Sequence, residues 1–240
     1  MNSVERDYVV SYLTLRQMIG WIGLLMPFAV RLGAYAFEGI PSTGSISAYY
    51  YTGMRDVFVS TLVLIGALFA CYRTPSWRDN LLATVAGIAA IGIGLFPMHP
   101  SYAAEIISKH PDIASGKCYL NRGLLGFHFL FVSIFFALAC YLVYFRFSAF
   151  TPPNPTPQKR VRNRVYKICG AIMAVSSLAI AYTVVARDGE SIFWPETVAV
   201  VSFAIAWLVK GQTIFLKDEL PTKGVENAAN HHPGRLTCRY

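Results

Sequence analysis

The stretch that most constrains the fold covers residues 45–72, SISAYYYTGMRDVFVSTLVLIGALFACY. Its apolar part, residues 57–72, is too short to cross a hydrocarbon core of roughly 30 Å at about 1.5 Å per residue. A spanning helix must therefore reach back through Arg55 and Asp56 to about Tyr50. This helix would place an Arg–Asp pair and a Tyr triplet at one membrane boundary. We expect Asp56 to be packed inside a bundle, because a carboxylate at this depth normally faces protein or water.

The composition also indicates a multi-spanning membrane protein. Of 240 residues, 55% are hydrophobic and only 14% are charged, which excludes an ordinary soluble domain of this size. The formal charge is +8, but the basic residues flank apolar runs, so we expect membrane lipids and no nucleic acid as partners. The five cysteines show no metal-ligand or disulfide pattern, and no cofactor is predicted.

Six apolar runs predict an all-α bundle of six transmembrane helices, which we assign to residues 1–216. The expected spans are residues 17–37, 50–72, 81–98, 124–145, 165–186 and 192–216. Short surface helices are expected within residues 1–16 and near residues 102–109. The polar tail, residues 217–240, is expected to be disordered.

Small residues in the third span predict one close helix contact. Ala86, Ala90 and Gly94 recur every four residues, so they share one helix face. Small side chains on one face allow a neighbouring helix to approach closely.

The distribution of basic residues predicts the orientation. With six spans, fifteen of the 21 Lys and Arg residues fall on one side, which places both termini in the cytoplasm. The run QKRVRNR contributes Lys159, Arg160, Arg162 and Arg164 to that side. These residues offer contacts to anionic lipid, or they act simply as a topology determinant.

Ionisable residues at similar depth near the outer side predict a polar cavity that opens outward and binds a lipid or small amphiphile. Residues of this kind inside a membrane are functional candidates, and a bundle core is a usual place for a ligand site. Tyr49, Tyr50 and Tyr51, together with Phe193 and Trp194, suit an outer aromatic belt or the lining of a lipid groove. The candidate ligand-binding residues are Arg31, Ser47, Tyr50, Arg55, Asp56, Ser60, His99, His128 and Glu196.

Each ionisable candidate also has a structural interpretation. Arg31 and Arg55 can reach the interface with their head groups, and either can pair with Asp56. Glu196 can stabilise the first turn of its helix through the helix dipole. His128 can be a neutral histidine that is hydrogen-bonded to a backbone carbonyl.

Two other function classes remain open at this stage. Asp56, His99, His128 and Glu196 together would provide two histidines and two carboxylates, as an intramembrane metal-dependent hydrolase requires, although no ligand-spacing motif supports such a site. No GxSxG motif marks a serine nucleophile. A transporter is a third class, but the chain lacks an evident internal repeat. Neither catalytic residues nor a resident metal are assigned.

Three segments carry a resemblance to known proteins. SISAYYYTGMRDVFVS, RVRNRVYKICG and FWPETVAVVSFAIAWLVKG resemble a group of bacterial six-helix inner-membrane proteins with the pattern SxSxYYYTxMRDxFV. The resemblance implies a six-helix fold and a location in the bacterial inner membrane, but no particular activity. More remotely, the serine-bearing loop before the second helix is similar to DRAM-type membrane proteins. The paired-histidine motif of alkaline ceramidases and related membrane hydrolases is missing.

Overall fold

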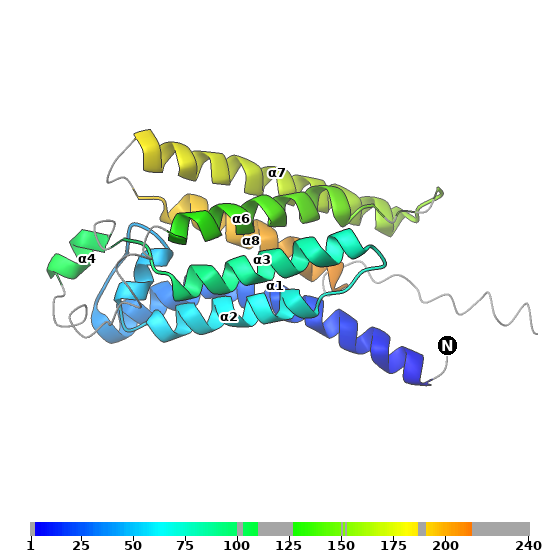
Figure 1. Ribbon diagram of the computed structural model, residues 1–240, viewed down its shortest axis with the longest axis horizontal. Helices are drawn as coiled ribbons and strands as arrows, with labels where there is room; N and C mark the ends of the chain where they lie inside the picture. Colours follow the sequence, from blue (N-terminus) through cyan, green and yellow to red (C-terminus); the bar gives the residue numbers. More distant parts are fainter. Residues whose placement is uncertain are drawn as a thin grey trace, which may run out of the picture.

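The computed structural model describes residues 3–99, 103–109, 127–149, 151, 153–186 and 191–212. All regular secondary structure in these ranges is helical, which confirms the predicted all-α class. Six long helices lie side by side along the longest axis of the molecule (Figure 1). They are α1 (Ser3–Glu38), α2 (Arg55–Cys71), α3 (Trp77–Leu95), α6 (Phe127–Tyr141), α7 (Pro157–Ala186) and α8 (Phe193–Lys210).

Within the described residues, five helices are long and apolar enough to cross a membrane. These candidate spans are Tyr12–Glu38, Trp77–Leu95, Phe127–Arg146, Pro157–Ala186 and Phe193–Lys210. Large apolar side chains on their outer faces are exposed, among them Leu178 at 71% and Val185 at 87%. Such surfaces are costly in water and suit contact with lipid. The helix α2 has 17 residues and packs between α1 and α3.

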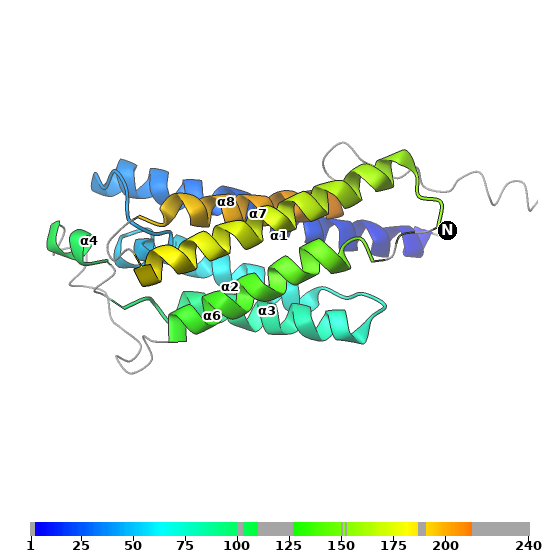
Figure 2. The ribbon, with the colours of Figure 1, turned by 90° about the horizontal axis from the view of Figure 1, so that it is seen from above.

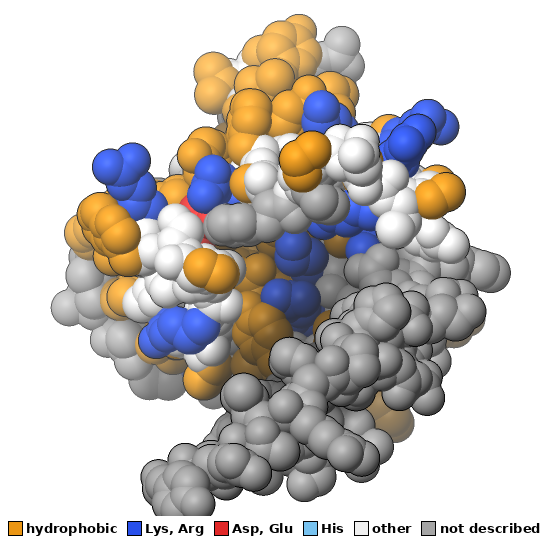
Figure 3. Space-filling model, turned by 90° about the vertical axis from the view of Figure 1, so that its right-hand side faces the viewer, with side chains coloured by type: hydrophobic (Ala, Val, Ile, Leu, Met, Phe, Trp, Pro, Cys, Tyr) orange, Lys and Arg blue, Asp and Glu red, His pale blue; other side chains and the backbone are white. Residues whose placement is uncertain are grey.

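The six long helices alternate in direction, which creates two ends. At one end, α1, α3 and α7 finish and α2, α6 and α8 begin (Figures 1 and 2). We call it the Ser47 end. The opposite end, where α8 finishes, is the Lys210 end. Lys and Arg side chains gather on the face of the Lys210 end (Figure 3).

The first two helices differ from the sequence prediction. The segment expected as a separate interfacial helix is continuous with the first span, and α1 runs through Pro27 without a break. The second helix begins at Arg55 and not near Tyr50, because residues 47–51 form a separate 3₁₀ helix, η1 (Ser47–Tyr51). The buried Tyr51 hydroxyl donates a 2.5 Å hydrogen bond to the Met98 carbonyl, which holds η1 against the chain that follows α3.

The remaining helices overlap their predicted positions, although α7 begins at Pro157, well before the predicted start at residue 165. Helix α3 begins earlier than expected because the Ser76 side chain caps it, accepting a 3.4 Å bond from the Asp79 amide. Helix α6 continues as a π-helical segment, η4 (Leu142–Arg146). The expected surface helix is α4 (Ala104–Lys109). The predicted tail, residues 217–240, lies outside the described residues.

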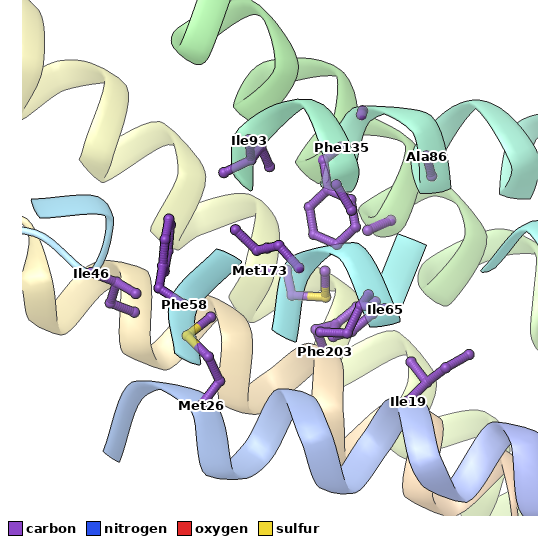
Figure 4. Packing of buried hydrophobic residues seen from close by; sticks show 14 of the residues in the cluster. Ile19, Met26, Ile46, Phe58, Ile65, Ala86, Ile93, Phe135, Met173 and Phe203 are labelled. Carbon is purple, nitrogen blue, oxygen red and sulfur yellow. The ribbon is translucent and has the colours of Figure 1, made fainter. Parts of the chain in front are cut away.

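Aromatic and aliphatic side chains from several helices fill the bundle core (Figure 4). Phe69 of α2 stacks on Phe203 of α8, with ring centroids 5.8 Å apart, and it also contacts Phe135 of α6 and Trp207 of α8. These ring contacts link three helices, so the core specifies how the helices are arranged around it.

The backbones of α2 and α3 approach closely at a pair of glycines. A Cβ atom built on Gly66 would lie 2.5 Å from the Gly87 carbonyl oxygen, and the reverse distance is the same. The predicted small-residue face of α3 is also buried, and Gly94 faces Val59 and Leu62 of α2. Small residues therefore allow the close contact between these helices.

Candidate functional site

A hydrogen-bonded loop positions the candidate site at the Ser47 end. The Gly44 carbonyl accepts bonds from the amides of Ile192 and Phe193, at 2.8 and 3.0 Å. Both amides lie at the N-terminus of α8, where the first helical turn has no intrahelical partners for its N–H groups. The chain between α1 and η1 is thereby fixed to the start of α8, with Ser45 and Ile46 next to Glu196.

Glu196 lies in the first turn of α8, and its carboxylate binds this loop. The Ser45 hydroxyl lies 3.0 Å from each carboxylate oxygen, and the Ile46 amide donates to Oε2 at 2.6 Å. The helix N-terminus also favours a negative charge at this place. Glu196 thus connects two segments that are far apart in the sequence.

Ser47 continues these contacts toward α6. Its amide donates to Ser45 Oγ at 3.1 Å, and its own Oγ lies 3.1 Å from His128 Nε2. His128 Nδ1 is 2.8 Å from the carbonyl oxygen of Phe96, just after α3. We call Ser45, Ser47, His128 and Glu196 the polar network.

The Phe96 carbonyl determines the tautomer of the buried, neutral imidazole. A carbonyl oxygen only accepts, so the hydrogen of His128 is on Nδ1. His128 Nε2 is then an acceptor, and the Ser47 hydroxyl is its donor. The arrangement leaves Ser47 Oγ with lone pairs that can accept a further hydrogen bond.

An apolar cavity of about 60 Å³ adjoins the polar network. Ser47 and Glu196 line it together with side chains from α1, α2, α3, α6 and α8. Figure 4 shows several of the apolar lining residues pointing toward one another in the core, among them Met26, Ile46, Phe58, Ile93 and Phe135. The cavity offers a slender apolar space with hydrogen-bonding groups in its wall.

The structure brings together only some of the predicted site residues. Ser47, His128 and Glu196 belong to one network. The Arg55 guanidinium donates to the Tyr50 hydroxyl at 2.8 Å and lies 4.6 Å from the Tyr50 ring centre. Arg31 of α1 lies over the rings of Phe193 and Trp194, at 5.0 and 5.3 Å. These two arginines bind aromatic residues and form no ion pair with Asp56 among the described residues.

Three further predicted residues also lie outside the network. The expected burial of Asp56 is wrong: its side chain is exposed, because it lies on the outer side of the first turn of α2, whose buried side is formed by Phe58. Ser60 is also exposed, and its hydroxyl bonds to the Asp56 carbonyl of the same helix at 2.5 Å. His99 is exposed beyond the end of α3.

The three tyrosines do not form an aromatic belt, which was one of the two interpretations of this segment. Tyr49, Tyr50 and Tyr51 are at most 2% exposed, since η1 folds them into the end of the bundle. A belt requires side chains that face the membrane interface. The three tyrosines instead close the core beside the polar network.

The four residues considered as metal ligands are not assembled. Asp56 and His99 are exposed, whereas His128 and Glu196 bind different serines. Among the described residues, no group of three or more His, Cys, Asp or Glu side chains is placed to hold a metal ion.

Sequence reasoning did not assign Ser45 or the Phe96 carbonyl to the site. The spacing of Ser45 and Ser47 was a usable signal, because two serines flanking one residue at the start of a 3₁₀ helix can bond to each other. No sequence pattern indicates the Phe96 carbonyl. A scan of protein-family models and searches of curated proteins and solved structures gave no match for this chain.

Proposed function

We propose that the protein is a six-span membrane protein of the bacterial inner membrane that binds a lipid or small amphiphile at the Ser47 end. The sixth span is α2, whose 17 residues reach the lower limit for a transmembrane helix. The excess of basic residues favours a cytoplasmic Lys210 end, with both termini on that side. The Ser47 end then faces outward.

The observation that carries the proposal is an apolar cavity with Ser47 and Glu196 in its wall. The cavity has room for a short segment of an alkyl chain, and the polar network lies where a head group would bind. The carboxyl oxygens of Glu196 accept hydrogen bonds from Ser45 and Ile46, and the Ser47 hydroxyl already donates to His128. The preferred head group is therefore a hydrogen-bond donor, such as a hydroxyl or an amine.

Lipid extraction and mass spectrometry of the purified protein test this proposal. Wild-type protein should retain a stoichiometric amphiphile, and Ser47→Ala should retain less of it. Ser60→Ala is the matched control, because that hydroxyl is exposed and bonds within α2. Equal retention by the wild type and Ser47→Ala, or no retained amphiphile at all, would contradict binding at this cavity.

The hydrogen bond from Ser47 to His128 favours a second function, a metal-independent acyl hydrolase. A serine that donates to a neutral, oriented imidazole is the pairing used for nucleophilic catalysis. In such a reaction Ser47 Oγ bonds to the acyl carbon of an ester, and its proton moves to His128. His128 then protonates the departing alcohol, and water hydrolyses the acyl-serine to the free acid and restores the Ser47 hydroxyl.

A fluorophosphonate probe separates the two functions. If the chain is a hydrolase, the probe should label wild-type protein at Ser47, and both Ser47→Ala and His128→Gln should abolish labelling. Ser60→Ala should be labelled like the wild type. Retention of an intact amphiphile by protein that does not react with the probe favours the binding function.

A further inference from the structure

A second cavity, of about 340 Å³, lies at the Lys210 end of the bundle. Lys and Arg side chains surround a hollow on this face of the molecule (Figure 3). The described lining includes five basic side chains and one carboxylate, contributed by five helical elements and the turn after α2: Arg16, Arg73, Asp79, Arg146, Lys159 and Lys210.

The single carboxylate is already paired. Arg146 donates to both oxygens of Asp79, at 2.6 and 2.9 Å, in a bidentate ion pair. Three other lining cations, Arg16, Arg73 and Lys210, have no carboxylate beside them among the described lining residues. Because like charges that share a cavity repel one another, their arrangement favours the binding of an anion.

Neutral groups hold Arg16 and Lys210 in place. The Arg16 guanidinium lies 4.1 Å from the Tyr12 ring centre and donates to the Lys210 carbonyl at 3.3 Å. Lys210 Nζ donates to the Phe147 carbonyl at 2.9 Å and lies 5.0 Å from the Phe147 ring centre. Rings and carbonyls orient a cation without adding a negative charge, so neither group cancels the positive potential of the cavity.

One further feature matches an anion. The first turn of α7, where Lys159 lines the cavity, holds no acidic residue. A helix N-terminus favours an anion, so α7 adds to the positive potential beside the cavity.

We propose that the Lys210-end cavity binds a phosphate group. Arginine and lysine together match a phosphate, which presents several acceptor oxygens to a planar guanidinium and to a point charge. Desolvation by burial raises the pKa of Tyr72 well above its ordinary value, so this lining hydroxyl stays neutral and adds no negative charge. The phosphate comes either from a lipid head group at the membrane surface or from inorganic phosphate in solution.

The test compares purified protein in nanodiscs of phosphatidylcholine with and without phosphatidylglycerol. Native mass spectrometry counts the phosphatidylglycerol retained, and calorimetry in the phosphatidylcholine discs measures binding of inorganic phosphate. Arg73→Gln removes an exposed lining charge and should fold, and Arg16→Gln removes a half-buried one. Arg164→Gln is the control, since Arg164 is exposed on α7 at the same end but does not line the cavity.

Each lining variant should weaken binding about fivefold, the usual effect of one basic residue near an anionic lipid surface. Loss of phosphatidylglycerol retention in Arg73→Gln but not in Arg164→Gln identifies a lipid head group. Loss of inorganic phosphate binding with the same pattern identifies the free anion. Binding of neither probe by the wild type, or equal weakening by Arg73→Gln and Arg164→Gln, would overturn the proposal. These outcomes do not depend on whether the cavity at the Ser47 end binds an amphiphile.

Discussion

Ser47 Oγ and His128 Nε2 lie 3.1 Å apart, although 81 positions separate the two residues in the chain. The bond joins η1 to the first turn of α6, and both side chains are buried, at 8% and 2% exposure. Through Ser45 and Glu196 the same network reaches the start of α8. The polar network thus fixes the positions of separate segments at one end of the bundle.

Breaking the Ser47–His128 bond should destabilise the protein. Ser47→Ala leaves a buried acceptor on His128 unpaired, and the expected loss is about 1–3 kcal/mol. The double variant Ser47→Ala with His128→Gln should lose less than the sum of the two single variants, because both remove the same bond. Thermal unfolding in detergent measures these effects. Ser60→Ala should change stability little, and strictly additive losses would contradict a direct coupling.

Glu196 should tolerate glutamine better than alanine. Glutamine keeps one acceptor oxygen for the Ile46 amide or the Ser45 hydroxyl, whereas alanine leaves both donors unpaired. We expect Glu196→Ala to lower stability by about 1–3 kcal/mol more than Glu196→Gln does. Unfolding of both variants under the same detergent conditions measures the difference. Equal stability of the two variants would show that these hydrogen bonds contribute nothing.

The glycine contact between α2 and α3 predicts a clash on substitution. Gly87→Ala should lose about 1–3 kcal/mol, because the added methyl group meets the Gly66 carbonyl of the neighbouring backbone. Gly23→Ala of α1 is the control, since its Cβ would find its nearest neighbours at an ordinary distance of 3.6 Å. Thermal unfolding compares the two variants. Equal effects would contradict the close approach of α2 and α3.

Cysteine labelling tests the proposed topology. A thiol reagent that does not cross membranes should label Cys118 in intact cells and should not label Cys71 or Cys238, each tested as a single-cysteine variant. Cys71 is exposed at the Lys210 end, so its protection would reflect the membrane and not burial. Labelling of Cys238 with Cys118 protected would show that the orientation is the reverse of the proposed one. Labelling of both cysteines would contradict the proposed six spans.

Hydrophobic patterning predicted most of the fold. Each spanning helix buries one apolar face in the bundle core and presents further apolar side chains to lipid on its opposite face, so the spans stand out as long apolar runs. The start of α2 was misplaced because the tyrosines at residues 49–51 are as compatible with a spanning helix as with a 3₁₀ turn. This error also led to the expectation that Asp56 is buried. A helix beginning at Tyr50 would place Asp56 beyond its first turn, whereas in α2 Asp56 lies in the first turn and is exposed.

The candidate site was only partly predictable. Position along each helix is predictable from the apolar runs, and it places His128 and Glu196 in the first turns of α6 and α8, at one end of the bundle. Depth alone does not determine which face of a helix a residue occupies, and His99 and Asp56 proved to be exposed. The polar network also depends on a loop and a backbone carbonyl, whose positions follow from tertiary packing and not from side-chain patterns.

Blocking the cavity without altering the polar network tests amphiphile binding most directly. Val200 of α8 lines the cavity, whereas Val198 of the same helix is 45% exposed and does not line it. Val200→Phe should fill the space and abolish retention of the amphiphile, and Val198→Phe should retain it at the wild-type level. Both variants are purified and analysed by lipid extraction and mass spectrometry. Full retention of the amphiphile by a folded Val200→Phe protein would contradict binding in this cavity.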